Sequence, residues 1–398
     1  MARVIFINRF YWPEEPATSQ LLTDLAQSAA ASGFPVSVIT SRRGGDSPRH
    51  ETHRDVKILR VGFARHDRRT PVFRMLDFAS FMFAALWRLW REVRGGDTVV
   101  ILTDPPLFGA LAAPLLDWRD ARVIHWVQDI YPEVAIALTG QRWLRLLQPW
   151  RNHTWRRADH CVTLGSDMAA VLLQAGVASD RLNVIPNWAP EGLAEAPEAD
   201  CARVKTDWGV AGKFIVLYSG NLGLVHDLMP VLRVAEALKD NPAIALVFVG
   251  HGGQHDALRR AAHERGLSNI TFQPPQPRTR LGAALSAGDL HWVTLKPGCE
   301  SCVMPSKLHG ILAVARPVLF IGPKSSALFR QIEAENLGLS FTRDQTTEAA
   351  AAILALKNDP ARRAAMAAQA RAHHGATGFA TSRDAWLNLL GRAPAPRQ

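Results

Sequence analysis

Short apolar runs rich in β-branched residues alternate along this chain with longer segments of helical periodicity, and this alternation constrains the fold most strongly. It is typical of parallel sheets built from strand–helix–strand units. The first half of the chain predicts strands at 4–8, 36–40, 57–61, 98–103, 122–127, 160–164 and 183–185. The second half predicts strands at 214–219, 245–250, 270–273, 290–295, 317–321 and 339–342. The chain is therefore predicted to be an α/β protein with two parallel sheets.

The length of 398 residues predicts two domains, since one domain usually takes about 100–200 residues. Prolines and a cluster of Glu and Ala residues between Pro190 and Asp200 indicate a linker. We expect an N-terminal domain over residues 1–190 and a C-terminal domain over residues 200–372. An amphipathic helix near residues 375–392 is expected to pack back on the N-terminal domain, before a Pro- and Arg-rich end that is expected to fray.

No apolar stretch reaches the roughly 18–20 residues that a membrane span needs. The apolar run Val4–Ile7 is also shorter than the roughly 7–15 residues of a signal-peptide core, so we expect a cytoplasmic protein. The cysteines Cys161, Cys201, Cys299 and Cys302 are then expected to stay reduced. Cys299 and Cys302 have zinc or redox spacing, but no second close Cys/His pair accompanies them, and no metal site is predicted.

The formal net charge of +10 predicts anionic partners, which include nucleic acid, acidic lipid headgroups and phosphorylated substrates. Between Gln141 and Arg157, arginines stand beside Trp143 and Trp150 without an acidic residue. Residues 78–87 carry no charge and contain three further aromatic candidates for a membrane-facing surface: Phe81, Phe83 and Trp87. Indole rings settle at lipid headgroups while guanidinium groups meet lipid phosphates. An anionic membrane surface is therefore the favoured partner. Amphipathic helices that pack on a sheet remain the alternative.

Nucleic acid is the less favoured partner, because no helix-turn-helix, zinc-finger or RNA-recognition signature is present.

Two segments of the second half are suited to phosphate. Lys307 follows Pro305 and Ser306 at a predicted helix start, where free N–H groups and the helix dipole add to its charge. The turn Ser219–Gly223 joins an apolar strand to a helical pattern, and its glycines let backbone amides approach a phosphate. Two such helix starts predict a nucleotide-sugar site in the C-terminal half.

Polar residues follow predicted strands of the first half, at the edge where open parallel sheets bind ligands. Tyr11, Trp12 and Glu14 follow the first strand, in a loop suited to stacking on a sugar or gripping an acceptor. Asp129 and Glu133 follow the fifth strand, where a carboxylate can orient an acceptor hydroxyl. Two structural alternatives stay open: the aromatic rings only cover the sheet edge, or Asp129 is a helix N-cap.

Several motifs in fixed order resemble family-4 glycosyltransferases of the GT-B fold, in the branch that makes exopolysaccharide and O-antigen. The motifs are residues 11–14 (YWPE), 104–107 (DPPL), 129–133 (DIYPE), 184–187 (VIPN), 218–223 (YSGNLG), 249–250 (VG) and 305–308 (PSKL). The resemblance covers nearly the whole chain. It implies two Rossmann-like domains that face each other across a cleft, with the nucleotide-sugar donor on the C-terminal domain. The acceptor, usually a polyprenyl-diphosphate sugar, would bind the N-terminal domain.

The resemblance also implies roles for individual residues. The donor site would consist of Gly220, Asn221, Gly223, Phe272, Gln273, Glu300, Ser306 and Lys307. Asp129 and Lys307 would be catalytic, in a retaining transfer of a sugar from a uridine or guanosine diphosphate sugar without a bound metal or cofactor. Two glutamates eight residues apart, common in the family, are replaced here by Cys302 and Gly310. No Asp-x-Asp motif is present.

Two other classes of function stay open. A nucleotide-sugar epimerase would not need the basic aromatic surface. A non-catalytic scaffold of a polysaccharide assembly would bind donor without turnover, and the replacement of the glutamate pair makes it conceivable.

Overall fold

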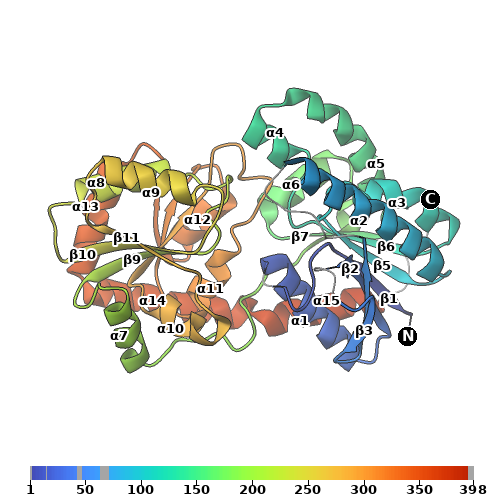
Figure 1. Ribbon diagram of the computed structural model, residues 1–398, viewed down its shortest axis with the longest axis horizontal. Coiled ribbons are helices and arrows are strands. Elements are labelled where there is room, and N and C mark those ends of the chain that lie inside the picture. The colour runs from blue at the N-terminus through green and yellow to red at the C-terminus, as the bar shows by residue number, and fades with distance from the viewer. Residues whose placement is uncertain (1, 15, 43–46, 63–70, 393–398) are drawn as a thin grey trace. The chain divides into compact units, whose positions relative to one another are not determined.

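The structure, a computed structural model, describes residues 2–14, 16–42, 47–62 and 71–392, with the backbone alone at 71–74. The predicted frayed end beyond residue 392 therefore lies outside the described residues. Contacts divide the chain into two units, drawn in Figure 1. The first unit comprises Met1–Asn187, Ser301–Met304 and Ala380–Gln398, and the second comprises Trp188–Glu300 and Pro305–Phe379. The short segment Ser301–Met304 was not predicted to join the first unit.

The first unit is built on one sheet in the order β3-β4-β2-β1-β5-β6-β7-β8. Its strands are β1 (Val4–Ile7), β2 (Val36–Ser41), β3 (His50–His53), β4 (Val56–Val61), β5 (Thr98–Leu102), β6 (Arg122–Trp126), β7 (His160–Thr163) and β8 (Leu182–Val184). Neighbouring strands are parallel except β3 and β4. The predicted strands of this half are confirmed. The edge strand β3 was missed because its sequence, HETH, is polar.

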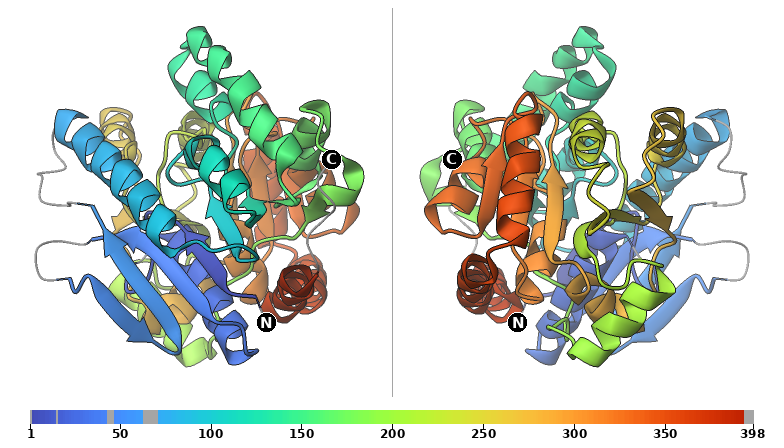
Figure 2. Two further views of the ribbon diagram at one scale, coloured as in Figure 1. Left: turned by 90° about the vertical axis from the view of Figure 1, so that its right-hand side faces the viewer. Right: turned by 90° about the vertical axis from the view of Figure 1, so that its left-hand side faces the viewer.

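Helices cover both faces of this sheet. They are α1 (Ala17–Ala31), α2 (Pro71–Glu92), α3 (Phe108–Trp118), α4 (Glu133–Thr139), η1 (Arg142–Leu147), α5 (Gln148–Arg157), α6 (Ser166–Gln174), η2 (Ser179–Arg181) and α15 (Phe379–Gly391). Helices α2 and α3 run side by side over one face (Figure 2, left), and their buried residues share a core with Ile5 and Ile7. On the other face, the ring of Trp386 from α15 packs on Trp126, with centroids 4.7 Å apart. No helix in the described ranges is both long and apolar enough for a membrane span.

The second unit is built on an all-parallel sheet in the order β11-β10-β9-β12-β13-β14. Its strands are β9 (Phe214–Ser219), β10 (Ile244–Val249), β11 (Ile270–Gln273), β12 (Leu290–Thr294), β13 (Val318–Ile321) and β14 (Gly338–Phe341). Its helices are α7 (Glu198–Asp207), α8 (Met229–Ala237), α9 (His255–Glu264), η3 (Arg278–Arg280), α10 (Leu281–Ser286), α11 (Lys307–Ala313), α12 (Ala327–Ala334), α13 (Thr346–Lys357) and α14 (Pro360–Thr377). All strands predicted for this half are present, and the predicted α/β class with two parallel-dominated sheets is confirmed.

Candidate functional site

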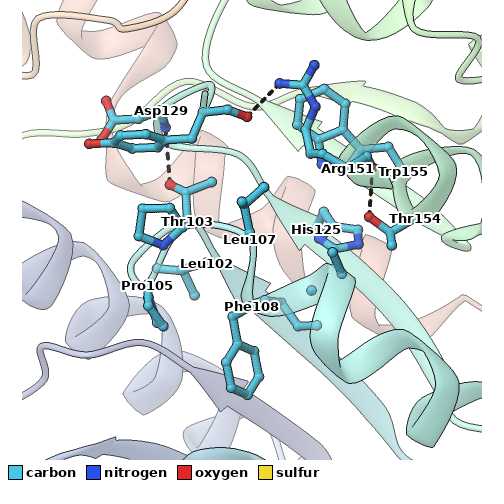
Figure 3. Close-up of a pocket in the computed structure, with 15 residues that line it drawn as sticks. Leu102, Thr103, Pro105, Leu107, Phe108, His125, Asp129, Arg151, Thr154 and Trp155 are labelled. Atoms are coloured by element: carbon cyan, nitrogen blue, oxygen red, sulfur yellow. Dashed lines mark hydrogen bonds between the residues drawn. The ribbon is translucent and has the colours of Figure 1, made fainter. Parts of the chain in front are cut away.

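The carboxyl edge of the first sheet surrounds a cavity of about 330 Å³. Its lining residues come mainly from the segments that follow β1, β5 and β6: Asn8, Arg9, Thr18, Phe78, Leu102, Thr103, Asp104, Pro106, Gln128, Asp129 and Tyr131. A smaller cavity of about 40 Å³ lies beside it and shares Leu102, Thr103, Pro106, Asp129 and Tyr131 (Figure 3). The predicted ligand-binding edge of this sheet is thus hollow and polar.

Asp129 lies at the junction of these two cavities. Its backbone N–H donates to the Thr103 hydroxyl over 3.2 Å, and it pairs with Val303 through an antiparallel bridge within the first unit. Burial, followed by the nearby charge of Asp104, raises the pKa of Asp129 to about 6. Asp129 is not a helix N-cap, because α4 begins at Glu133 with Pro132 at the cap position. Its carboxylate is therefore free of that structural role.

A second carboxylate of the cavity, Asp104, pairs with Arg9. The Arg9 Nε and Nη2 atoms lie 3.1 and 3.3 Å from the two Asp104 oxygens. Burial raises the pKa of Asp104, although the Arg9 charge opposes this rise. The pKa of Tyr131 is raised to about 12, first by burial and then by the charges of Asp129 and Asp104. The cavity therefore combines acidic, basic and hydroxyl groups. Arg9 is not among the site residues predicted from the sequence.

Glu133, which was predicted to bind an acceptor, is engaged by Arg151. Two Arg151 nitrogens donate to the two Glu133 oxygens over 2.6 and 2.8 Å, and Nη1 also donates to the Tyr131 carbonyl over 2.7 Å. The guanidinium lies 4.0 Å from the Trp155 ring centroid. This bidentate pair ties the loop after β6 to α5. The Glu133 carboxylate therefore holds the loop, and its contact with an acceptor stays a prediction.

The aromatic loop after β1 differs from its prediction at one residue. Tyr11 is only 2% exposed, so the prediction that its side chain contacts an acceptor is wrong. Trp12 is partly exposed and stacks on His53, with centroids 3.9 Å apart. The Glu14 N–H donates to the Tyr11 carbonyl over 3.0 Å. These three residues thus form a compact turn, with Trp12 and Glu14 nearer to solvent than Tyr11.

In the second unit, Lys307 is the first residue of α11, as predicted. Its Nζ lies 3.6 Å from the Tyr218 ring centroid and 3.4 Å from His226 Nε2. No carboxylate forms an ion pair with Lys307 in the part of the chain that the structure describes. Burial lowers the pKa of Lys307 well below its ordinary value. The ammonium is thus held by uncharged groups, which leaves room for an anionic ligand.

The glycine turn lies next to Lys307. A Cβ on Gly220 would be 3.8 Å from Lys307 Cε, so the lysine stem passes close to this turn. The Tyr218 hydroxyl donates to the Asn221 carbonyl over 2.9 Å, and the Gln254 amide donates to the Gly223 carbonyl over 2.6 Å. The structure therefore brings together four predicted donor residues: Gly220, Asn221, Gly223 and Lys307.

The other predicted donor residues also belong to the second unit. Phe272 stacks on Phe248 with centroids 5.4 Å apart. The Gln273 carbonyl accepts the Gly250 N–H over 3.1 Å, which links it to the strand beside the glycine turn. Ser306 is exposed directly before α11. Glu300 accepts from the Gly298 N–H over 2.6 Å and from the Ser325 hydroxyl over 3.3 Å.

The predicted membrane-facing residues are exposed with one exception. Phe83 is 74% exposed, Trp87 60%, Trp143 62% and Trp150 42%. Phe81 is only 1% exposed, and the prediction that it faces a membrane is wrong. Residues two positions apart on a helix point in directions about 200° apart, so Phe81 enters the core while Phe83 points outward.

Comparison with known proteins supports one family along both halves. The profile described as "Glycosyltransferase Family 4" matches residues 18–190, and that described as "Glycosyl transferases group 1" matches residues 205–373. The chain is 32% identical over 252 residues to the putative colanic acid biosynthesis glycosyl transferase WcaI of Escherichia coli K12, covering 61% of each chain. It is 27% identical over 270 residues to the probable glycosyltransferase WbjE of Pseudomonas aeruginosa, covering 66% of each. The matches thus span somewhat less than two thirds of these relatives.

Solved structures resemble the fold over its full length. A sucrose-phosphate synthase from Thermosynechococcus elongatus superposes with a TM-score of 0.77 at 17% identity, covering 98% of both chains. Anabaena HepE in complex with UDP and glucose superposes with a TM-score of 0.74 at 15% identity, covering 99% of this chain and 100% of HepE. At such identities the likeness concerns the fold alone. The likeness shows the GT-B fold, and the two matched profiles, which together cover most of the chain, show that it belongs to glycosyltransferase family 4.

Proposed function

We propose that the protein is a retaining, metal-independent glycosyltransferase of the hexosyltransferase type that acts in bacterial surface polysaccharide biosynthesis, either of exopolysaccharide or of lipopolysaccharide. It takes a sugar from a UDP-sugar and transfers it to a lipid-linked saccharide, such as a polyprenyl-diphosphate sugar. Family membership and the names of the relatives WcaI and WbjE support this proposal.

The observation that carries the proposal is the Lys307 ammonium beside the Gly220 turn. It has aromatic and imidazole neighbours at 3.6 and 3.4 Å but no carboxylate partner among the described residues. A diphosphate would supply the missing anion, and its charge would stabilise both the bound donor and the leaving group. Uridine is the proposed base because HepE, which shares this fold, was solved with UDP and glucose.

The cavity of the first unit is the proposed acceptor site. Asp129 faces it with a pKa of about 6, so its carboxylate is ionised at neutral pH and can orient an acceptor hydroxyl. Trp12 and Glu14 are retained as proposed acceptor contacts at the same edge.

A membrane surface is proposed as the place where the protein binds its lipid-linked acceptor. Exposed apolar residues on α2, η1 and α5, here called the aromatic surface, are Phe83, Trp87, Trp90, Trp143, Leu146 and Trp150. Exposed arginines stand beside them at Arg91, Arg142 and Arg145. Rings and guanidinium groups in this mixture suit an anionic bilayer. The protein would then work in the cytoplasm, peripherally bound to the inner face of the cell membrane.

The first test is calorimetric titration with UDP, GDP and ADP in the presence of EDTA. We expect selective binding of UDP, weakened roughly 10- to 100-fold in Lys307→Ala, because one charge-assisted contact of about 1.5–3 kcal/mol is lost. Lys239→Ala, which removes an exposed lysine of the same unit, serves as the matched control. Equal affinity of Lys307→Ala and the unmodified protein would contradict the donor site.

One alternative function keeps a specific observation in its favour. The family's usual glutamate positions are occupied by Cys302 and Gly310, which is compatible with a non-catalytic scaffold. Nucleotide binding without turnover on any lipid-linked acceptor would support the scaffold. Turnover only between free nucleotide sugars would instead support an epimerase.

A further inference from the structure

The contacts of Lys307 assign a distinct role to His226. His226 lies in the loop between β9 and α8 and is only 8% exposed. Its Nδ1 is 2.7 Å from the Thr294 carbonyl at the end of β12, and its Nε2 is 3.4 Å from Lys307 Nζ. A carbonyl only accepts hydrogen bonds, so Nδ1 must carry the proton. In the neutral ring, Nε2 is then an acceptor that faces the lysine.

Burial, above all, keeps the ring of His226 neutral. Burial lowers the pKa of His226 to about 3, and the charges of Lys307 on α11 and Lys296 after β12 act in the same direction. The adjacent Asp227 is engaged by Arg343, whose Nε lies 3.3 Å from the carboxylate. His226 therefore serves as an acceptor for Lys307 throughout the neutral pH range, and it does not compete with the lysine as a second cation.

The loop that carries His226 is fixed by further contacts. The Gln254 amide donates to the carbonyls of both Gly223 and His226, over 2.6 and 3.0 Å. The Tyr218 ring meets the imidazole edge-on, with centroids 5.9 Å apart, and also lies under the Lys307 ammonium. An ammonium has three N–H donors. One directed at His226 leaves two for a ligand at the Gly220 turn.

We propose that His226 is a positioning residue that holds the Lys307 ammonium at the Gly220 turn for the diphosphate of the donor. This inference rests on the proposed function. It adds the reason why one lysine suffices to bind the donor diphosphate. No arginine or lysine stands at residues 224–226, directly after the glycine turn. A neutral acceptor that orients Lys307 keeps this single positive charge directed at the diphosphate.

Two substitutions distinguish the roles of the two imidazole nitrogens of His226. In His226→Gln, the side-chain carbonyl can reach the place of Nε2 and accept from Lys307. In His226→Asn, the shorter amide can replace Nδ1 and donate to Thr294, but it leaves Lys307 without its acceptor. We expect His226→Asn to bind UDP roughly 3- to 10-fold more weakly and His226→Gln to bind it nearly as the unmodified protein does. His263→Asn makes the same change on the exposed surface of α9 and should have no effect.

The combination with Lys307→Met tests whether His226 acts through the lysine. We expect the double variant His226→Asn/Lys307→Met to bind UDP no more weakly than Lys307→Met alone. If the two losses add instead, His226 acts independently of Lys307 and the inference fails. It also fails if His226→Asn binds UDP normally while Lys307→Met does not, and this result would leave the proposed function intact. If Lys307→Met has no effect, the donor site itself is wrong.

A spectroscopic measurement tests the geometry without any nucleotide. Nitrogen-15 spectra of the histidine rings, with His226 assigned through His226→Gln, should report a proton on Nδ1 and none on Nε2 between pH 6 and 8. A proton on Nε2 would overturn the inference whatever the affinity for UDP. Thermal unfolding of each variant shows whether a change in affinity reflects loss of folded protein.

Discussion

At the scale of single residues, burial determines the chemistry of the first unit's cavity. Asp129 and Asp104 lie near each other, and Asp104 has a guanidinium partner, Arg9. Desolvation and the like charge make Asp129 the carboxylate that is harder to ionise, with a pKa near 6. A carboxylate that titrates close to neutral pH is better suited to accept a hydroxyl proton than one with an ordinary pKa.

Asp129→Asn is therefore expected to lower kcat for sugar transfer by about 10²- to 10⁴-fold. Its affinity for UDP should stay unchanged, because the donor residues belong to the second unit. In the unmodified protein, transfer should increase as the pH rises through about 6, where Asp129 ionises. Steady-state rates between pH 5 and 8 with a lipid-linked acceptor measure both effects. Undiminished transfer by Asp129→Asn would exclude the proposed role.

The same raised pKa has a consequence for stability. Because the folded-state pKa of Asp129 exceeds that of an exposed aspartate, the folded protein binds the proton more tightly than the unfolded chain does. This contribution to stability is present at acid pH and is lost as the pH rises from about 4 to about 6. Asp129→Asn should thus be at least as stable as the unmodified protein at pH 7.5. A lower melting temperature of the variant at that pH would contradict this account.

Residue roles were harder to predict from the sequence than residue positions. Tyr11, Asp129 and Glu133 were all expected at the carboxyl edge of the first sheet, and they do lie after β1 and β6. What the sequence could not indicate is that Tyr11 is buried and that Glu133 pairs with Arg151. Both depend on which side chains pack together, and no local pattern contains that information.

At the scale of elements, hydrophobic periodicity predicted nearly all strands, because a strand buried in a parallel sheet is apolar along its length. Strand β3 was missed because it is an edge strand with exposed polar side chains. The pairing of Val303 with Asp129 was also missed. It joins segments far apart in sequence, and an isolated bridge leaves no periodic signal.

The turns of the second unit depend on close backbone approach between elements. Gly250 follows β10 with φ of 128°, and a Cβ there would lie 2.3 Å from the Gly220 carbonyl oxygen. A side chain at this position must therefore displace the glycine turn beside Lys307. The glycine accounts for how the loops after β9 and β10 can lie side by side.

Gly250→Ala is expected to destabilise the second unit by about 1–3 kcal/mol, from the strained backbone, and to weaken UDP binding by displacing the turn. Gly253→Ala is the matched control in the same loop, because a Cβ there meets nothing within 4 Å. Chemical denaturation followed by hydrogen exchange in β9 and β10, together with calorimetry with UDP, measures the two effects. Equal behaviour of the two variants would show that the close approach is not required.

At the scale of the whole molecule, the basic charge and the exposed aromatic residues both bear on whether the protein binds an anionic membrane. The net charge is +10, and ten large apolar side chains among the described residues of α2, α3, η1 and α5 are exposed: Met75, Leu76, Phe83, Trp87, Trp90, Leu111, Trp118, Trp143, Leu146 and Trp150. Arg119 of the α3 end donates to the Trp90 carbonyl over 3.2 Å, and Arg157 of α5 pairs with Asp117 of α3 over 3.1 Å. These contacts link α3 to both α2 and α5. The exposed apolar residues therefore belong to neighbouring helices of one unit.

We expect the protein to bind vesicles that contain phosphatidylglycerol and to bind uncharged phosphatidylcholine vesicles much more weakly. Replacement of Trp87 and Trp143 by alanine should weaken binding to the anionic vesicles by roughly tenfold, since each indole contributes on the order of 1 kcal/mol at an interface. Leu173→Ala, on the exposed surface of α6, is the control for general loss of apolar area. Co-sedimentation at 50 and 300 mM salt separates the contributions of the arginines and of the indole rings to vesicle binding. Salt screens the arginine charges and leaves the indoles effective. Equal binding by the double-tryptophan variant and the control at both salt concentrations would exclude the aromatic surface as the membrane contact and would leave the acceptor to be met away from the bilayer.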